Sequence, residues 1–383
     1  MRPDRRVLRA AAAALLLAAL PAAPAALGAQ WAAPPADTLA RLLAERIESG
    51  GAAGVVLGVV ERGWPRVVAA GRRGGEGTPG VDARTVFEIG SVSKVLTTTL
   101  LAEMAVRGEV ALDEPIRNFL PDSVRAPSRG GREITLLDLA TATSGLPRLP
   151  GNLAPADFRN PYAGYEARDL YAFLAGYTLP RDPGAAYEYS NLGMGLLGHL
   201  LALRAGKEYE ALVIERILAP LGMRDTRLVL TASMRERLAA GHGAGLEPVG
   251  GWDFAVLAGA GGWRSTAEDM LRFLAAQLSP PPGPLGRAIA MTQEPRRPAG
   301  PPGDSRIGLG WHVLERNGRA IVWHNGQTGG YHAFLGFEPA SGANVLVLAN
   351  TAADLDDLGL RLLAPGLRCG MRDGRRQCWR ESR

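Results

Sequence analysis

Eight residues in the first third of the chain read FEIGSVSK, at positions 87–94. The apolar residues that follow recur at helical spacing, which predicts that Ser91 and Lys94 lie in the first turn of a buried helix. Positions three apart share one helix face, so the Lys94 amine can lie beside the Ser91 hydroxyl. A serine hydroxyl needs a base to become a good nucleophile, and a desolvated lysine amine can be that base. The stretch therefore predicts a nucleophilic serine at a helix N-terminus, where developing negative charge is also favoured.

Lysine is rare in this chain. Of the 43 basic residues, only Lys94 and Lys207 are lysine. A lysine can lose its proton in a desolvated site, whereas a guanidinium cannot. A lysine kept in such an arginine-rich chain is therefore either one that arginine cannot replace or a chance result of codon usage.

A second motif, Tyr189-Ser190-Asn191, follows Pro183-Gly184 and precedes an expected helix over residues 192–204. A tyrosine at the start of a helix can project into a cleft. Two nearby cations could lower the pKa of its phenol enough for Tyr189 to act as a general base. The alternative is a hydrogen-bonded loop tyrosine beside an asparagine that caps the helix.

A third motif, His324-Asn325-Gly326, ends an apolar strand expected over residues 320–323. A glycine beside an exposed strand lets the backbone of a substrate approach closely. A basic residue at this place can meet a carboxylate. The alternative is an ordinary histidine at a sheet edge before a turn.

Strand-like segments lie near both ends of the chain, and helix-like segments lie between them. We expect strands over residues 54–60 and 66–70, joined by a turn at 62–65, and over 310–314, 320–323, 331–337 and 343–349. We expect helices over residues 36–47, 92–107, 136–142, 192–204, 266–277 and 354–363. The proline-rich stretch near residues 280–302 is interpreted as a surface connection that returns the chain to the sheet.

This order of elements predicts an α+β fold, in which one antiparallel sheet is formed from both chain ends with flanking helices. A mostly helical domain is inserted into it. The α/β sheet domain is expected to comprise residues 30–91 and 300–367, and the helical domain residues 92–299. Clefts form where such domains meet, so the active residues are expected at the join.

The net charge of +5 is unevenly distributed. Residues 1–29 carry +3 and residues 368–383 carry +4, which leaves −2 for the rest of the chain. A nearly neutral body is not that of a nucleic-acid-binding protein. The sequence has no H-E-x-x-H motif and no phosphate-binding loop, so neither a metal nor a cofactor is expected. The absence of G-x-S-x-G also disfavours an α/β-hydrolase.

Residues 1–29 have the pattern of an export signal. A basic segment precedes an apolar run over residues 10–20, and Ala26-Leu27-Gly28 offers a cleavage site. We therefore expect a periplasmic or secreted protein with no stable membrane insertion, because no later apolar run reaches the length of a bilayer span. In the arginine-rich tail over residues 368–383, Cys369 and Cys378 could pair in an oxidising compartment or stay idle thiols.

Together the motifs resemble the penicillin-recognising serine hydrolases, specifically the class C β-lactamase-like group with its related D-Ala-D-Ala peptidases and esterases. The resemblance covers nearly all of residues 35–365. FEIGSVSK is similar to the group's active-site block, Tyr189-Ser190-Asn191 to its Y-x-N element, and His324-Asn325-Gly326 stands where most β-lactamases have K-T-G. Supporting blocks are LDLATATSGLP (137–147), ILAPLGMRDT (217–226) and GGWRSTAEDMLRF (261–273).

The resemblance implies a β-lactamase/transpeptidase-like fold and a role for each matching residue. Ser91 attacks the acyl carbonyl, and Lys94 helps to remove its proton. Tyr189 passes that proton to the leaving nitrogen and later activates the deacylating water. The remaining implied roles concern binding: Asn191 holds Lys94 and the substrate amide, the backbone N–H groups of Ser91 and Gln327 form the oxyanion hole, and His324, Asn325 and Gly326 contact the substrate.

The histidine at position 324 departs from the family pattern. It replaces a permanent cation with a group that is mostly neutral at pH 7. We therefore expect His324 to bind carboxylate substrates in its protonated form, with affinity that weakens above about pH 7. β-Lactam hydrolysis is the preferred function, the alternatives being a D-Ala-D-Ala carboxypeptidase/endopeptidase, an esterase, or a non-catalytic binder of penicillin or peptidoglycan fragments.

Overall fold

The structure is a computed structural model that describes residues 31–300, 305–316, 318–364, 367–372 and 375–380. Among these residues, eight strands form one antiparallel sheet in the order β2-β1-β14-β13-β12-β11-β10-β9. The strands are β1 (Gly54–Glu61), β2 (Trp64–Gly71), β9 (Arg297–Pro298), β10 (Ser305–Ile307), β11 (His312–Arg316), β12 (Arg319–Gln327), β13 (His332–Glu338) and β14 (Ala343–Ala349).

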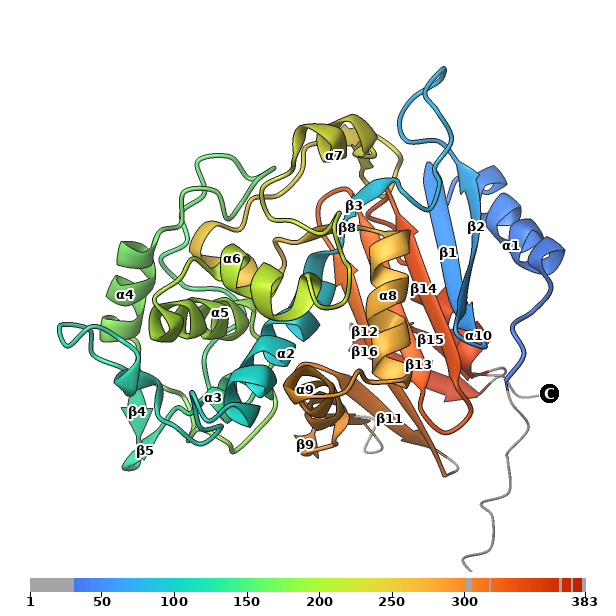
Figure 1. The fold of residues 1–383 in the computed structure, drawn as a ribbon. Helices are drawn as coiled ribbons and strands as arrows, with labels where there is room; N and C mark the ends of the chain where they lie inside the picture. The colour runs from blue at the N-terminus through green and yellow to red at the C-terminus, as the bar shows by residue number, and fades with distance from the viewer. Residues whose placement is uncertain (1–30, 301–304, 317, 365–366, 373–374, 381–383) are drawn as a thin grey trace, which may run out of the picture.

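Both ends of the chain contribute to this sheet, as the sequence predicts. Strand β1 lies between β2 and β14, and Val55 pairs with Ala349. In Figure 1 the blue strand β1 therefore runs beside the orange-red strand β14. The predicted fold class, an antiparallel sheet from both chain ends with helices around and between, is confirmed.

The turn between β1 and β2 is tighter than expected. It consists of Arg62 and Gly63 alone, with φ of 53° and 83°, and Trp64 and Pro65 already belong to β2. Two consecutive left-handed residues match the right-handed twist of a hairpin, which explains the short connection. Because β2 is an edge strand, Pro65 needs no ladder partner on its outer side.

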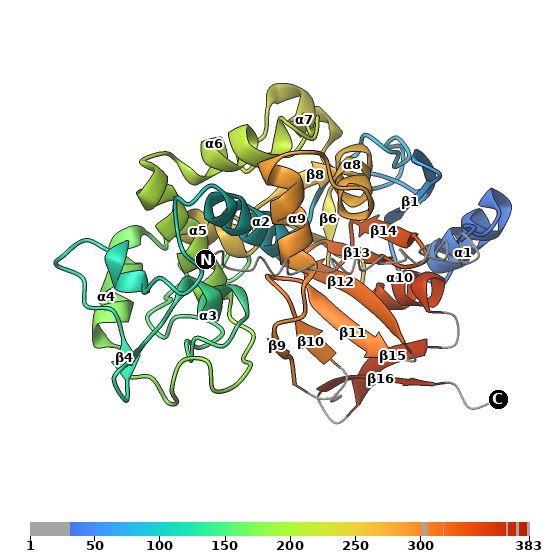
Figure 2. The same cartoon turned by 60° about the horizontal axis from the view of Figure 1, so that its bottom comes forward.

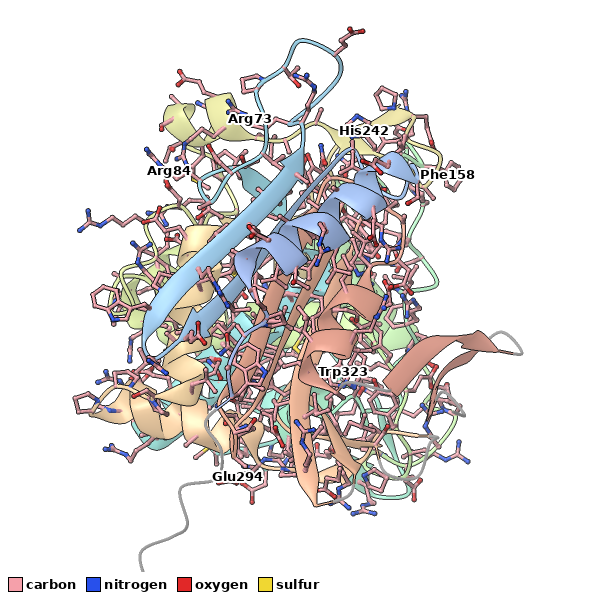
Figure 3. All side chains as sticks on the ribbon, turned by 90° about the vertical axis from the view of Figure 1, so that its right-hand side faces the viewer. Arg73, Arg84, Phe158, His242, Glu294 and Trp323 are labelled. Atoms are coloured by element: carbon pink, nitrogen blue, oxygen red, sulfur yellow. The ribbon has the colours of Figure 1, made fainter. Side chains whose placement is uncertain are left out.

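Helices cover both faces of the sheet (Figures 1 and 2). One face packs against α1 (Ala36–Glu48) and α10 (Asp356–Leu363), and Figure 3 shows Trp323 on this side of the molecule. The other face packs against α8 (Ala267–Leu278). Alternate residues of each strand therefore belong to two separate apolar cores, for example Val55 and Val56 of β1.

The proline-rich stretch is not only a surface connection. It contains a helix, α9 (Pro284–Gln293), which lies beside α2 (Ser93–Val106) in Figure 2. Its first residue is Pro284, a position where the missing N–H costs nothing. Leu285, Ala288 and Ile289 are buried at helical spacing. The packing of these side chains therefore stabilises a helix, although the composition of the segment is typical of a loop.

The helical region occupies the side of the sheet that faces away from α1. Its central helices, α2 and α5 (Asn191–Ala205), are enclosed almost entirely. The other helices of this region are α3 (Leu136–Ala140), α4 (Ala167–Gly176), α6 (Tyr209–Val213) and α7 (Ala232–Arg237), with 3₁₀ turns η1 (Gly90–Val92), η2 (Ile116–Asn118) and η4 (Ala255–Ala260) and a π-helical turn η3 (Ile214–Leu218). Helix α2 lies at the join between this region and the sheet (Figure 1).

Small two-stranded ladders complete the fold. They pair β3 (Val86–Glu88) with β8 (Arg264–Thr266), β4 (Ser128–Arg129) with β5 (Arg132–Glu133), β6 (Gly241–His242) with β7 (Pro248–Val249), and β15 (Leu367–Arg372) with β16 (Arg375–Arg380). The backbone register of the last ladder sets Cys369 opposite Cys378, and the disulfide between them stays a prediction.

The expected export signal at residues 1–29 lies outside the described residues. Within the part of the chain that the structure describes, no helix has both the length and the apolar character needed to cross a bilayer.

Candidate active site

Ser91 lies at the join predicted from the sequence. It belongs to the 3₁₀ turn η1, which leads directly into α2. Gly90 takes a φ of +48°, and a Cβ at that position would lie 2.7 Å from the backbone nitrogen of Gln327. Only glycine tolerates both this backbone conformation and this close approach, and its presence lets η1 pack directly against the end of β12. Ser91 itself is half-buried.

Lys94 is surrounded by three oxygen atoms. Its Nζ lies 3.0 Å from Ser91 Oγ, 2.8 Å from Asn191 Oδ1 and 2.6 Å from the carbonyl oxygen of Ala260. The side chain is almost completely enclosed. Burial, and to a lesser extent the positive charge of Arg148, hold the pKa of Lys94 well below its ordinary value. The structure thus brings Ser91, Lys94 and Asn191 together.

Tyr189 borders the same group. Its hydroxyl is hydrogen-bonded to Ser91, and its ring centroid lies 4.7 Å from Lys94 Nζ and 5.1 Å from the guanidinium carbon of Arg148. Burial raises the pKa of Tyr189 to about 12, against the lowering effects of the Ser91 hydrogen bond and of Arg148.

The expected lowering of the Tyr189 pKa is therefore wrong. Desolvation outweighs both the hydrogen bond to Ser91 and the positive charge of Arg148. Tyr189 keeps its proton in the free protein and can donate it.

Asn191 is the first residue of α5 rather than its cap. The cap is Ser190, whose Oγ accepts a hydrogen bond from the backbone N–H of Gly193. The Asn191 side chain is thereby free to point toward Lys94, and its Nδ2 donates to the hydroxyl oxygen of Tyr162 at 3.1 Å.

His324 points toward the same group but carries no charge at neutral pH. It is only 1% exposed, and its ring centroid lies 5.2 Å from that of His312 and 6.4 Å from that of Tyr189. Burial, then the neighbouring His312 and Lys94, hold the pKa of His324 well below its ordinary value. The expectation that protonated His324 binds a carboxylate is corrected accordingly, because an enclosed histidine beside other basic groups stays neutral.

Asn325 faces the opposite side of the sheet. Its Nδ2 donates to Asp356 Oδ2 at 2.7 Å, and Asp356 belongs to α10. Successive side chains of a strand alternate between faces, so Asn325 cannot share the surface that His324 reaches. This placement overturns the expected contact between the Asn325 side chain and a substrate.

The remaining two residues of this strand end lie against Ser91. A Cβ on Gly326 would lie 2.0 Å from the carbonyl oxygen of Ile89 and 2.9 Å from the nitrogen of Ser91, so no larger residue fits. The backbone nitrogens of Ser91 and Gln327 are thereby held close together. The Gln327 side chain points elsewhere, and its Nε2 donates to the carbonyl oxygen of Ala352 at 2.6 Å.

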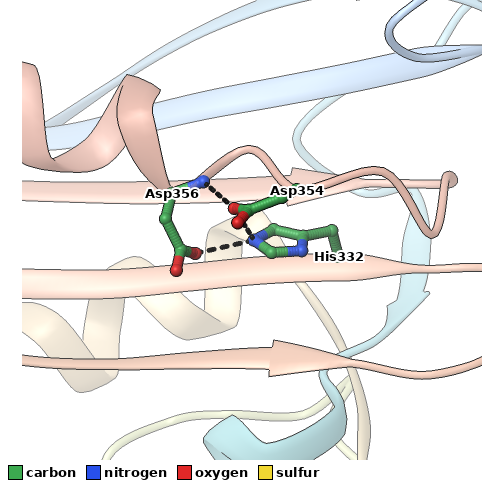
Figure 4. A group of neighbouring side chains, drawn as sticks. All are labelled: His332, Asp354 and Asp356. Atoms are coloured by element: carbon green, nitrogen blue, oxygen red, sulfur yellow. Dashed lines mark hydrogen bonds and ion pairs between the residues drawn. The ribbon is translucent and has the colours of Figure 1, made fainter. Parts of the chain in front are cut away.

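A possible cation site lies on the far side of the sheet (Figure 4). One ligand atom each of His332, Asp354 and Asp356 lie within 4.8 Å of one another. However, His332 Nε2 is 2.7 Å from Asp356 Oδ1, and the other oxygen of Asp356 accepts from Asn325. These hydrogen bonds occupy atoms that a metal ion would need. We therefore assign the group a structural role, in which it ties β12, β13 and α10 together.

The catalytic motifs assign no role to two residues near the site. Arg148 immediately follows the block at residues 137–147, and Glu88 lies within FEIGSVSK. Glu88 is enclosed and lies 3.1 Å from the guanidinium of Arg264, and the two residues pair across β3 and β8. Both partners stand in blocks that the sequence singles out, but only the folded chain shows that they meet.

The family model for beta-lactamases matches residues 39–364. D-alanyl-D-alanine-carboxypeptidase/endopeptidase AmpH of Escherichia coli is 31% identical over 316 residues, which cover 78% of this chain and 79% of AmpH.

Solved structures also resemble this chain. A class C beta-lactamase from Rhodobacter sphaeroides is 27% identical with a TM-score of 0.72, over 83% of this chain and 95% of that one. A beta-lactamase/D-alanine carboxypeptidase from Yersinia pestis complexed with citrate is 28% identical with a TM-score of 0.72, over 82% of this chain and 92% of that one. The motifs, the fold and these similarities lead to one conclusion: this chain belongs to the beta-lactamase family.

Proposed function

We propose that the protein is a serine hydrolase that forms an acyl-enzyme on Ser91 and hydrolyses β-lactams. One observation carries the proposal: Lys94 Nζ lies 3.0 Å from Ser91 Oγ and is also bound by two oxygens that can only accept hydrogen bonds. These are the amide oxygen of Asn191 and the carbonyl oxygen of Ala260. A neutral amine has two hydrogens and one lone pair, so both hydrogens go to these acceptors. The lone pair is then directed at the Ser91 hydroxyl.

This arrangement supports a direct proton transfer. As Ser91 Oγ attacks the acyl carbon, its proton moves to Lys94 Nζ and the Oγ–carbon bond forms. The backbone N–H groups of Ser91 and Gln327 are the proposed donors to the oxyanion, since Gly90 and Gly326 allow them to lie close together.

Tyr189 supplies the second proton transfer in this proposal. Its phenol is protonated at neutral pH, because burial raises its pKa to about 12, and it is hydrogen-bonded to Ser91. It can give its proton to the leaving nitrogen as the carbon–nitrogen bond breaks, and it is then restored by the proton held on Lys94. In deacylation water attacks the acyl carbon and gives a proton to the neutral Lys94 amine. The bond between the acyl carbon and Ser91 Oγ then breaks, and Oγ takes that proton from Lys94, which regenerates Ser91.

A second candidate is a D-Ala-D-Ala carboxypeptidase/endopeptidase. It is favoured by the 31% identity to AmpH, a protein named for that activity. The same residues would carry out both reactions, since each begins with attack on an amide carbonyl. The two differ in how fast water cleaves the penicilloyl-enzyme.

The distinguishing experiment is the intact mass of the purified protein through a time course with benzylpenicillin. A Ser91→Ala variant is the control. We expect an adduct of the mass of penicillin that needs Ser91 and clears as penicillin is consumed. An adduct that persists would favour the peptidase. Absence of both adduct and penicillin loss would overturn the proposal.

We also propose that the protein is exported, as the signal-like pattern at residues 1–29 supports. Fractionation of cells that produce the full chain tests this. A mature form shortened near Gly28 in the periplasm or medium is expected, and an uncut protein in the cytoplasm would contradict it.

A further inference from the structure

Arg148 is held at the edge of the site by its backbone. Its carbonyl oxygen accepts hydrogen bonds from the N–H groups of Asn191 and Leu192, at 3.0 and 3.2 Å. The preceding carbonyl, of Pro147, accepts from Ser190 Oγ at 2.6 Å. The loop that carries Arg148 is therefore fixed to the N-terminus of α5, the same segment that positions Asn191.

The side chain of Arg148 reaches over the site but stays in solvent. Its guanidinium carbon lies 5.1 Å from the ring centroid of Tyr189, and the residue is exposed. Lys94 and His324, in contrast, are 2% and 1% exposed. Of the three basic groups around Tyr189, only Arg148 is accessible to a bound molecule.

Arg148 also differs from other arginines nearby. Arg264 is paired with Glu88 at 3.1 Å, and Arg297 with Asp138 at 2.7 Å. Within the described ranges, no ion pair includes Arg148. Its positive charge instead acts on the site, where it adds to the lowering of the Lys94 pKa and opposes the rise that burial causes in the pKa values of Tyr162, Tyr187 and Tyr189. An unpaired guanidinium beside a nucleophile is able to accept an anionic partner.

The charge of Arg148 is permanent and exposed, whereas the side chains of its two basic neighbours, Lys94 and His324, are enclosed. A guanidinium keeps its proton at any physiological pH, and its planar donors match a carboxylate in two parallel hydrogen bonds. His324, which occupies the place expected for a cation, is enclosed beside His312 and cannot supply this charge at neutral pH. The site therefore has one exposed cation among these three groups.

We propose that Arg148 binds the carboxylate of the acyl donor and determines the preference of this site for anionic substrates. The assignment rests on the proposed function, because it concerns molecules that acylate Ser91. A substrate whose carboxylate reaches the Arg148 guanidinium gains two charge-assisted hydrogen bonds there. A neutral analogue of the same shape gains none.

The test compares benzylpenicillin with its methyl ester, which lacks the negative charge. The acylation rate constant of each is measured by intact mass for the wild type, Arg148→Gln and Arg148→Lys. We expect Arg148→Gln to slow benzylpenicillin by roughly 10- to 100-fold, in line with the loss of charge-assisted hydrogen bonds, and the ester by less than about threefold. Arg148→Lys keeps the charge and should lie between the wild type and Arg148→Gln.

Two control variants isolate the effect. Arg84→Gln removes an equal charge from an exposed residue that points away from the body of the protein in Figure 3. Leu149→Ala changes the neighbouring exposed residue without changing charge. Neither should alter the ratio of the two rates.

The outcomes separate the two proposals. Wild-type protein that acquires no adduct and consumes no penicillin overturns the proposed function and, with it, this assignment. Wild-type protein that is acylated while Arg148→Gln slows both compounds equally overturns only the carboxylate assignment, because it shows that Arg148 merely positions α5. Unchanged rates for both compounds in Arg148→Gln overturn that assignment too.

Discussion

The side chains of His324 and Asn325 leave β12 on opposite faces of the sheet. His324 lies among Tyr189, His312 and Lys94, whereas Asn325 donates a hydrogen bond to Asp356 in α10. His324 therefore belongs to the site, whereas Asn325 holds the sheet to α10. Their variants should differ accordingly.

Asn325→Ala should lower the stability of the protein more than its rate of acylation. It leaves the enclosed carboxylate of Asp356 without one of its donors, a loss worth about 1–3 kcal/mol in free energy of unfolding. Urea denaturation measures this loss, and the acylation rate of folded protein should change by less than about threefold. Loss of acylation at unchanged stability would instead place Asn325 at the substrate.

His324→Gln should leave the pH dependence of acylation unchanged between about pH 6.5 and 8.5. The lowered pKa of His324, caused first by burial, means that it is already neutral throughout this range. Rates with benzylpenicillin at each pH check this. A wild-type rate that declines above pH 7, and a variant in which the decline disappears, would show that the charge of His324 matters after all.

Acid should destabilise the protein partly through His324. Below its ordinary pKa of 6.5 the unfolded chain takes up a proton at this residue, whereas the folded protein does not until its lowered pKa is reached. Stability is therefore present above pH 6.5 and declines as the pH falls. Melting temperatures at pH 5 and pH 7.5 should differ less for His324→Gln than for the wild type. An equal difference would contradict the buried neutral state.

Lys94→Arg should abolish acylation even though it keeps a basic residue. A guanidinium cannot give up its proton, and loss of a general base costs about 10²- to 10⁴-fold. The matched control is Lys207→Arg, which alters an exposed lysine paired with Glu215. Stopped-flow or mass measurements of acylation compare the two. Substantial activity in folded Lys94→Arg would rule out Lys94 as the base.

Gly326→Ala should separate β12 from the turn that carries Ser91. The added methyl would lie 2.0 Å from the carbonyl oxygen of Ile89, so one of the two backbone segments must move. Displacing one oxyanion donor typically costs about 10²-fold or more in rate. Gly176→Ala is the control, because a Cβ there has nothing within 4 Å. Equal activity in the two variants would show that this close approach is unimportant.

Much of the fold follows from local patterns. The helices begin and end within a few residues of the expected positions, for example α1 (Ala36–Glu48) and α8 (Ala267–Leu278), because their apolar spacing and end signals are strong. Local sequence patterns do not predict helix α9. Its prolines and glycine indicate a loop, and the packing of Leu285 and Ile289 against other elements decides otherwise.

For the site, the sequence alone determined which groups stand close along the chain: Ser91 and Lys94 share a helical turn, and a turn is local geometry. It could not determine the protonation states. Those depend on how much water the fold removes from each group and on charges brought from distant segments. Burial keeps the pKa of Tyr189 high and those of Lys94 and His324 low, so only the tertiary structure shows where the charge of the site resides.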